Sequence, residues 1–555
     1  MTTVRTKLIS SLEKCFLDEN IEDKAQKNHF TMLRNERLSF QIAYTVLDDP
    51  SAPEFFANRI AVEIQGKLAP YTTIRECVCV PVHKPTFQGS QGALLRTEAG
   101  LYPDLLRPLH FDHGICAPAG QLRSLWIDIE LPPAYPSGTQ TVSIVFSENH
   151  EQVASETATI RIKDAMLPPQ TLIHTEWFHT DSIANYYRVP PFSEEHWTIL
   201  SSFLKTAVRN GINMILTPIL TLRADTYVGG ERLTTQLIDI ERMSDGTYVF
   251  DFGKLERWIN LCLDCGVQYF EMPHLFSRGG TSTPKVIVKI GEERVKLFDW
   301  NTDPLGEEYA SFLRQFLPAV VGVFQKRDLH RQCFFHISDE PHPEHLAQYL
   351  RCKALVKPYI GDCPIIDALS DIRFFESGAV EKPIPVTSKI EPFLKANIPG
   401  LWAYYAASHS KTSNRLHAMP LSRTRILGVQ LYYYHIEGFL HWGYNFYNNL
   451  RSYDPINPFL CTDGEGYVGG DTFLVYPGDD KTAWESLRSN AMREAMDDIR
   501  ALQLYESLFG REATEQLILE ELDRPLTFTE YPTDPDYLLH LRERIAEAVT
   551  VSPEY

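Results

Sequence analysis

The sequence has no long apolar segment. No window approaches the roughly 18 consecutive apolar residues that a membrane-spanning helix needs. Residues 1–20 contain Arg5, Lys7 and Lys14 but no continuous apolar core, so they do not have the pattern of a secretory signal. From these two absences we expect a cytoplasmic protein that has no membrane partner.

Positive charge is also scarce. The chain has 53 Lys and Arg against 72 Asp and Glu, which gives a formal net charge of −19. Such a balance argues against nucleic acid and against an anionic lipid surface as partners. It is compatible with a neutral or cationic small substrate, and equally with a charge that only keeps the protein in solution.

Motifs that hold metals, nucleotides or disulfides are missing. The ten cysteines are scattered, and the pair Cys262 and Cys265 lies in a helical pattern without a second pair. His274 and His336 could act as ligands, but no other ligands at metal-binding spacing surround them. Glycine-rich phosphate-binding loops are absent as well. We therefore expect no metal and no cofactor.

The residues that are present indicate an ordinary globular chain of several domains, with 555 residues of which 44 % are hydrophobic. Between about residues 31 and 162, strand-length segments alternate with turns, which predicts an all-β sandwich domain over residues 1–165. The segments are 38–46, 59–65, 76–82, 122–130 and 140–146. The sequence 163–169 ends in two prolines and predicts a linker.

After the linker, strand patterns alternate with helical ones, which indicates parallel strands joined by crossover helices. Eight such strand patterns predict a (β/α)8 TIM-type barrel over residues 170–450. The strand patterns are 171–179, 213–218, 267–272, 333–338, 364–368, 384–386, 400–406 and 438–445. Residues 451–555 then predict a small C-terminal extension, with a β segment and helices that pack on the barrel.

The segment 333–341, C-F-F-H-I-S-D-E-P, carries the strongest signal for chemistry. An apolar strand ends in two carboxylates, Asp339 and Glu340, and Pro341 prevents the strand from continuing. Active-site groups of α/β barrels follow the carboxyl ends of strands in this way. The alternative interpretation is an acidic helix N-terminus, in which the two acids only stabilise the first turn.

Other predicted strands end in aromatic and polar residues that a sugar would contact. Aromatic rings pack on sugar C–H faces, and hydroxyl groups need polar partners. Each aromatic taken alone is more often part of a core. Their common position at strand ends favours a carbohydrate site. The candidates are Trp177, His274, Trp402, Tyr404, Trp442 and Asn445.

Two adjacent acids do not easily flank a sugar ring from opposite faces, as most glycosidases require. They fit substrate-assisted hydrolysis better, in which the 2-acetamido oxygen of the sugar is the nucleophile. Two alternatives stay open. One is a conventional retaining glycosidase with Glu271, Glu376 or Glu437 as nucleophile. The other is a catalytically silent carbohydrate-binding barrel.

Several segments, in this order, resemble glycoside hydrolase family 123, the β-N-acetylgalactosaminidase family. They are L-R-N-E-R-L-S-F-Q at 33–41, H-I-S-D-E-P at 336–341, W-A-Y at 402–404, G-F-L-H-W-G-Y-N at 438–445, G-D-T-F-L-V-Y-P-G at 470–478, and the closing motifs at 486–488, 493–494 and 497–498.

The resemblance implies a retaining, exo-acting enzyme that removes β-linked N-acetylgalactosamine from small glycans through an oxazoline intermediate. Glu340 would be the general acid and then the base, and Asp339 would orient the acetamido group. The residues expected to line the sugar pocket are Trp402, Tyr404, Trp442 and Asn445, joined by His274 and Trp177. The sequence does not decide between galacto and gluco sugars, nor the oligomeric state.

Overall fold

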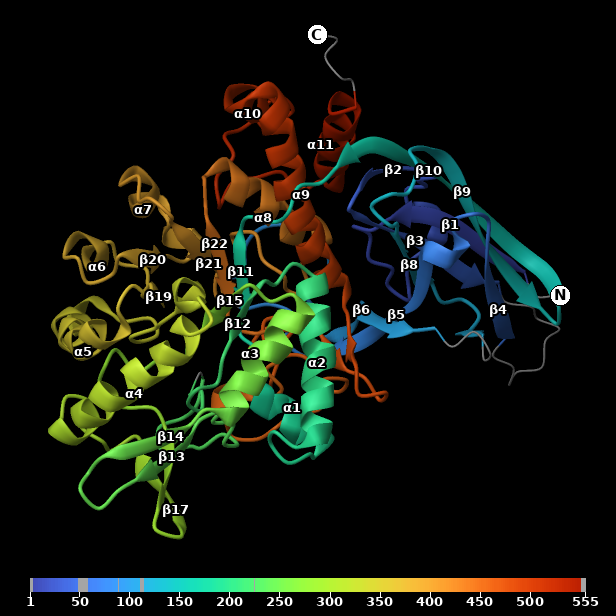
Figure 1. The fold of residues 1–555 in the computed structure, drawn as a ribbon. Helices are drawn as coiled ribbons and strands as arrows, with labels where there is room; N and C mark the ends of the chain where they lie inside the picture. The colour runs from blue at the N-terminus through green and yellow to red at the C-terminus, as the bar shows by residue number, and fades with distance from the viewer. Residues whose placement is uncertain (1–2, 48–57, 88, 110–113, 224, 551–555) are drawn as a thin grey trace. The chain divides into compact units, whose positions relative to one another are not determined.

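The computed structural model describes residues 3–47, 58–87, 89–109, 114–223 and 225–550 (Figure 1). The chain divides into two compact units. The first, here called the N-terminal unit, is Met1–Thr171 with Ser413–Tyr433 and Trp484–Tyr555. The second, the central unit, is Leu172–Thr412 with Tyr434–Ala483. Among the described residues, no helix has the length and apolar character needed to cross a membrane.

The N-terminal unit contains two five-stranded sheets that share one hydrophobic core. Their strands pair antiparallel, except for β2 and β10, which are parallel. The sheet orders are β1(Val4–Ser10)–β3(Arg37–Val46)–β8(Arg123–Glu130)–β5(Thr72–Val82)–β6(Gly100–Pro108) and β2(His29–Arg34)–β10(Glu151–Met166)–β9(Gly138–Glu148)–β4(Asn58–Gln65)–β7(Ile115–Ala117). Alternate residues from both sheets, such as Phe40, Ile127 and Phe146, fill the core.

The five predicted strand segments of this region lie in β3, β4, β5, β8 and β9. Other strands have weaker patterns. In β6, Pro103 interrupts the run, and it is tolerated because β6 is an edge strand, where one unpaired backbone position costs little. Strand β10 is 16 residues long and largely polar, so apolar and polar residues do not alternate clearly along it.

Four helices complete the N-terminal unit: α8 (Leu421–Tyr433), α9 (Leu487–Phe509), α10 (Arg511–Leu519) and α11 (Pro535–Ala548). Ser486 caps α9 through a reciprocal pair of hydrogen bonds with Ser489. Charged side chains on α8 and α9 are buried as ion pairs and do not face solvent. Arg425 binds Asp498 and Glu494, each at 2.8 Å.

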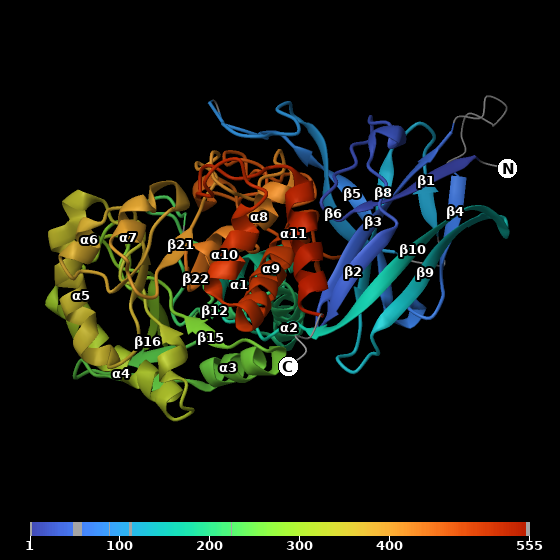
Figure 2. The same cartoon turned by 90° about the horizontal axis from the view of Figure 1, so that it is seen from above.

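The central unit is built on a six-stranded parallel sheet (Figure 2). Its order is β18(Cys333–Phe334)–β15(Tyr269–Glu271)–β12(Met214–Leu216)–β11(Ile173–Glu176)–β22(Gly438–His441)–β21(Trp402–Tyr404). A second, two-stranded parallel sheet contains β19 (Ile366–Ala368) and β20 (Lys382–Ile384). Isolated parallel bridges join Phe335 to Ile365 and Val386 to Tyr404. Each of the eight predicted strand patterns overlaps one of these strands, and most observed strands are shorter.

Helices of the central unit lie between successive strands along the chain, as the crossover pattern predicts. They are α1 (Thr180–Tyr187), α2 (Glu194–Arg209), α3 (Gly253–Cys265), α4 (Glu307–Gln325), α5 (Leu346–Ile360), α6 (Arg373–Glu376) and α7 (Glu391–Lys395). A four-stranded sheet that the sequence did not predict, β14(Tyr248–Asp251)–β13(Asp239–Arg242)–β16(Val286–Ile290)–β17(Glu293–Phe298), arises from the segments on either side of α3. Inward-facing residues, among them Leu216, Phe334 and Trp402, form the core of the parallel strands.

The first residue of β22 must be glycine, because the Trp402 indole lies on it. A Cβ at Gly438 would come within 2.1 Å of a ring carbon of Trp402, which is only 1 % exposed. We expect Gly438→Ala to lower the free energy of unfolding by about 1–3 kcal/mol, the usual cost of overpacking a core. Denaturant unfolding measures this change.

The matched control is Gly322→Ala, in α4, where no heavy atom lies within 4 Å of the added Cβ. There the substitution should stabilise slightly, because alanine favours helix over glycine by up to about 1 kcal/mol. Equal stability changes in the two variants would contradict the packing argument.

Candidate active site

The two predicted catalytic acids lie directly beyond strand β18, and both are accessible. The side chain of Asp339 is 45 % exposed, and Glu340 is an exposed residue. Glu340 has a φ of 37°, in the left-handed region that glutamate seldom occupies. Pro341 disfavours the ordinary helical conformation for the residue before it, and the Glu340 N–H donates to the Ala368 carbonyl at 3.1 Å. The strained backbone is thus held in place by its neighbours, a feature common at functional sites.

Tyr404, at the end of β21, orients the Glu340 carboxylate. Its hydroxyl donates to Glu340 Oε1, while its ring is 6 % exposed. Burial, and then the adjacent Glu340 charge, raise the pKa of Tyr404 well above its ordinary value. The phenol therefore remains a neutral hydrogen-bond donor at physiological pH. The predicted site residues Glu340 and Tyr404 are in direct contact, although 64 positions separate them.

Asp339 and Glu340 together retain a proton near neutral pH. Desolvation, and then the neighbouring Glu340 carboxylate, raise the pKa of Asp339 to about 8. Two carboxyl groups this close titrate as a pair. At pH 7 Asp339 therefore favours its protonated form, so the pair has a proton available for acid catalysis.

A buried network lies behind the acids. His336 Nε2 is 2.7 Å from Glu271 Oε1, and His336 Nδ1 is 3.1 Å from Asp367 Oδ1. Glu271 also accepts hydrogen bonds from the Trp177 indole at 2.8 Å and from the Thr175 hydroxyl. Burial alone would lower the pKa of His336, but the hydrogen bonds to Asp367 and Glu271 outweigh it and raise that pKa to about 10.

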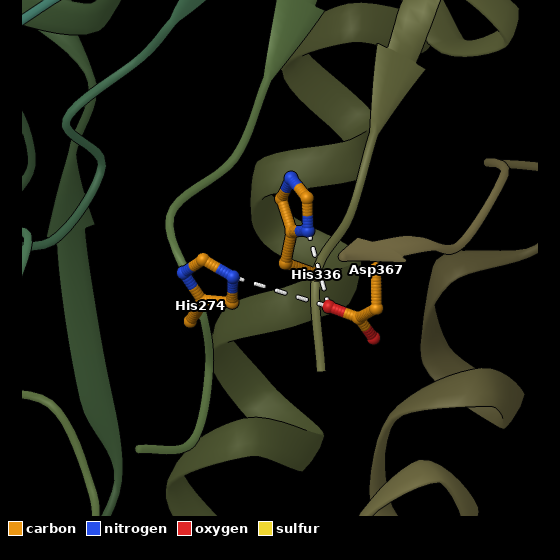
Figure 3. A group of neighbouring side chains, drawn as sticks. All are labelled: His274, His336 and Asp367. Carbon is orange, nitrogen blue, oxygen red and sulfur yellow. Dashed lines mark hydrogen bonds and ion pairs between the residues drawn. The ribbon is translucent and has the colours of Figure 1, made fainter. Parts of the chain in front are cut away.

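His274 lies next to His336 and Asp367 of this network (Figure 3), and it is also near Asp339. Its Nε2 is 3.9 Å from Asp339 Oδ1 and 4.0 Å from Asp367 Oδ1, and its ring centroid is 4.5 Å from that of His336. Burial, and then the nearby His336, lower the pKa of His274 well below its ordinary value. His274 is therefore a neutral imidazole at physiological pH.

His274, His336 and Asp367 place ligand-type atoms within 4.8 Å of one another (Figure 3). Two imidazoles and a carboxylate are a donor set that zinc accepts. However, both ring nitrogens of His336 face carboxylate oxygens at hydrogen-bonding distance. A ring that donates from both nitrogens has no lone pair for a metal. In this arrangement the cluster fits a proton better than a metal ion.

The other predicted pocket residues fall into two groups. Trp442 is half-buried, and its indole donates to Asp471 Oδ2 at 3.2 Å. Trp402 and Asn445, by contrast, are 1 % and 0 % exposed. Trp402 packs in the core against Phe334, and the Asn445 amide binds the backbone N–H and carbonyl of His179. Both side chains are thus buried and held by protein contacts, and their contacts with a sugar stay a prediction. Trp177, 3 % exposed, acts through its bond to Glu271.

The three glutamates considered as nucleophiles for a two-carboxylate mechanism occupy unsuitable positions. Glu271 is fully buried and already accepts hydrogen bonds from three side chains. Glu437 immediately precedes β22, whereas the two acids follow β18. In a parallel sheet, the amino ends and the carboxyl ends of the strands lie on opposite sides. Glu376 is exposed on helix α6.

Asp367 and Tyr349 are site residues that sequence reasoning missed. Asp367 lies in the apolar strand β19 and is fully buried, and it accepts from the Tyr349 hydroxyl and from the Ile337 N–H at 3.0 Å. A carboxylate within an apolar strand needs buried partners, so the pattern Ile365-Ile366-Asp367-Ala368 was a usable signal. Tyr349, on α5, had no comparable signal.

Comparison with known proteins adds an independent line of evidence. A family model described as "Glycoside hydrolase 123, catalytic domain" matches residues 177–505. Among solved structures, the fold resembles a family 123 glycoside hydrolase from Clostridium perfringens, which is described in connection with glycolipid glycan hydrolysis. The two chains are 16 % identical, with 99 % of this chain and 98 % of the other covered, and the TM-score is 0.74.

Other solved structures are more distant. An endo-β-1,4-mannanase from Thermotoga petrophila is 12 % identical over 60 % of this chain and 77 % of its own, with a TM-score of 0.34. A GH5 xyloglucanase from Bacteroides ovatus is 9 % identical over 85 % and 98 %, with a TM-score of 0.29. A comparison with curated proteins finds no match.

Proposed function

Because this chain belongs to glycoside hydrolase family 123 and is a glycoside hydrolase, we propose that it is a retaining exo-β-N-acetylgalactosaminidase with substrate-assisted catalysis. The observation that carries the proposal is the pair of adjacent, accessible carboxyl groups, Asp339 and Glu340, directly beyond a parallel strand, with the pKa of Asp339 raised to about 8. One group can then act as an acid while the other stays charged. That division of labour is what a 2-acetamido nucleophile demands of a protein.

In the proposed mechanism, Glu340 gives its proton to the glycosidic oxygen while the C1–O bond breaks. The acetamido carbonyl oxygen of the sugar bonds to C1 and forms an oxazolinium ion, whose charge and N–H Asp339 stabilises. Water then attacks C1, Glu340 takes a proton from it, and the ring reopens to the product of retained configuration. Tyr404 holds Glu340 in place, since its hydroxyl binds Oε1. Trp442 and His274, near the same strand ends, are the proposed sugar contacts.

The strand pairing supports a (β/α)8 barrel as the scaffold. The six-stranded sheet ends in β18 and β21, and the isolated bridges Phe335–Ile365 and Val386–Tyr404 connect both ends to the β19–β20 pair. We propose that these bridges close the ring, with a β-sandwich over residues 1–165, the barrel over 170–450 and the extension over 451–555. All groups assigned to catalysis then follow the carboxyl ends of barrel strands.

For the substrate we propose a small glycan with a terminal β-linked 2-acetamido sugar. The Clostridium perfringens protein of the same family is described as acting on glycolipid glycans, which makes a glycolipid-derived oligosaccharide a suitable first test. Aryl glycosides decide the class of sugar. We expect hydrolysis of aryl 2-acetamido-2-deoxy-β-galactosides, inhibition by the matching thiazoline, and no turnover of aryl glycosides that carry a 2-hydroxyl.

Turnover of 2-hydroxy glycosides at a comparable rate would rule out the acetamido nucleophile. A covalent adduct formed with a 2-fluoro sugar on Glu271, Glu376 or Glu437 would instead support the conventional two-carboxylate mechanism. Sugar binding by calorimetry without turnover of any aryl glycoside would indicate a silent binding barrel.

The pH dependence follows from the shared proton. A carboxyl pair whose upper pKa is about 8 keeps its acidic proton below that pH and loses it above. We therefore expect kcat/KM to fall as the pH rises through about 8, with a slope of one proton. Initial rates with an aryl 2-acetamido glycoside between pH 4 and 10 measure this limb. A rate that stays level to pH 10 would contradict the assignment.

A further inference from the structure

We propose that His336 is a permanently protonated positioning residue, whose positive charge is held between Glu271 and Asp367 and lowers the proton affinity of the Asp339–Glu340 pair. The catalytic consequence rests on the proposed function, but the protonation of His336 does not. His336 touches no substrate in this scheme and acts through the two acids.

The geometry favours two protons on the ring. A neutral imidazole has one N–H donor and one acceptor nitrogen. His336 is fully buried, with Nε2 at 2.7 Å from Glu271 Oε1 and Nδ1 at 3.1 Å from Asp367 Oδ1. Were the ring neutral, one nitrogen lone pair would face a carboxylate lone pair with no water between them. An imidazolium donates to both oxygens and removes this repulsion.

The two carboxyl groups that flank His336 also accept hydrogen bonds from other donors. Glu271 accepts from Trp177 Nε1 and the Thr175 hydroxyl, in addition to His336. Asp367 accepts from the Tyr349 hydroxyl and the Ile337 N–H, in addition to His336. Each carboxyl group therefore has three donors, and for Asp367 these hydrogen bonds oppose the burial that raises its pKa above the ordinary value. Consistent with this, the pKa of His336 is raised to about 10.

The charge of His336 acts on Asp339 through space and lowers its pKa. His336 precedes Asp339 by three residues, and His274 is within 4.0 Å of both Asp339 Oδ1 and Asp367 Oδ1. The charges that act on Asp339 have opposite effects: Glu340 and Asp367 raise its pKa, and His336 lowers it. The ionisable groups around the pair are Glu271 on β15, His274 after β15, Tyr349 on α5, Asp367 on β19, Tyr404 on β21 and the half-buried His409.

Histidine is neutral in most buried sites near pH 7 and is titrated readily. Without the His336 cation, the pair would face Asp367 and Glu271 as anions with no nearby positive charge from this network. Asp339 would then hold its proton more tightly, because Glu340 and Asp367 raise its pKa and His336 is the charge that lowers it. The cation thus makes it easier for the pair to carry a negative charge.

The first test observes the proton directly in the wild-type protein. The chain has 18 histidines, and ¹³Cε1 labelling gives each ring a signal that reports its charge. We expect one signal to remain at the imidazolium position from pH 6 to 9 and to disappear in His336→Gln. In Glu271→Gln, which removes one of the two anions, the same signal should begin to titrate within this range. If every signal titrates below pH 8 in the wild type, the proposal is wrong.

The second test uses the pH profile of kcat/KM. In His336→Gln, both limbs of the profile should move to higher pH by at least about one unit, because a nearby opposite charge typically shifts a carboxyl pKa by 1–3 units. At a fixed pH on the acid limb, this displacement is about a tenfold change in rate. The matched control is His274→Gln, which removes a neutral imidazole from the same cluster. The two limbs of the kcat/KM profile of His274→Gln should keep the pH positions of the wild type, even if the substitution changes the rate. A lower rate without displacement of the limbs in His336→Gln would show a purely structural role.

A metal-bound His336 is the competing interpretation, and a chelator distinguishes it. Dialysis against EDTA should leave both the NMR signal and the rate unchanged. Loss of activity that Zn²⁺ restores would overturn the proposal, since a nitrogen bound to zinc cannot carry the proton. If no aryl glycoside is hydrolysed but the imidazolium signal persists, the proposed function fails and the protonated network stands.

Discussion

Glu340→Gln should lower kcat/KM for an alkyl or sugar 2-acetamido-β-glycoside by about 10²–10⁴-fold, the usual contribution of a general acid–base group. Glutamine keeps the shape and can still accept the hydrogen bond from Tyr404 to Oε1, but it has no proton to give to the leaving oxygen. The fold should remain intact, because Glu340 is exposed and its carboxylate makes no buried ion pair among the described residues. Circular dichroism and thermal unfolding check the fold, and initial rates measure the loss.

The leaving group supplies a sharper control. A dinitrophenyl glycoside departs without protonation, so its first step should be far less affected by Glu340→Gln. Added azide should then restore turnover with that substrate and yield a β-glycosyl azide, because azide attacks the oxazoline without a general base. Glu344→Gln, the same substitution four residues along on an exposed site, should leave kcat/KM unchanged. Equal losses for good and poor leaving groups would contradict the acid role.

The position of Asp339 and Glu340 at a strand end could be predicted from the sequence because its signal is local. An apolar strand, two acids and a proline lie within nine consecutive residues, 333–341, and backbone rules convert that order into a strand end. The alternation of strands and helices was equally readable. Each predicted strand pattern between residues 171 and 445 contains or overlaps an observed parallel strand.

The depth of a side chain in the site could not be predicted in the same way. Trp402 and Tyr404 are two residues apart on β21 and so face the same side. One layer separates them: the Tyr404 hydroxyl reaches Glu340, whereas Trp402 lies over Gly438 and is buried. The alternation of side chains along a strand predicts which side of the sheet a residue faces, but not how deeply it is buried on that side.

Side-chain contacts between different strands could also not be predicted from the sequence. Glu271, His336 and Asp367 come from three different strand ends, 65 and 31 residues apart, and they meet only because β15, β18 and β19 pair in a particular register. The sequence shows His336 as a histidine in an apolar strand, and without a metal motif it indicates no role for this residue. The structure places its ring between two carboxyl groups, Glu271 and Asp367, and so indicates a role in proton binding.

Asp339→Asn should reduce kcat/KM for 2-acetamido substrates by a factor similar to that of Glu340→Gln, and it should weaken thiazoline inhibition as well. Asparagine cannot provide the negative charge that the oxazolinium requires, so the inhibitor, which resembles that intermediate, loses the same interaction. Glu340→Gln should affect thiazoline affinity less, which separates the two roles. Equal inhibition constants for wild type and Asp339→Asn would contradict the assignment of Asp339.

The same variant should gain stability while it loses activity, and the sign can be worked out from the pKa. The pKa of Asp339 rises from an ordinary 3.8 to about 8 on folding, so between these values the native state holds a proton more tightly than the unfolded chain does. Stability then falls as the pH rises from about 4 to 8. Asparagine has no proton to lose, so Asp339→Asn should melt at a higher temperature than the wild type at pH 8, with the difference disappearing at pH 4. Because the side chain is 45 % exposed, solvent reduces the size of the gain but not its sign. A melting temperature lower than the wild type at pH 8 would show that the charged carboxylate stabilises the fold, and the shared-proton description of the site would then be wrong.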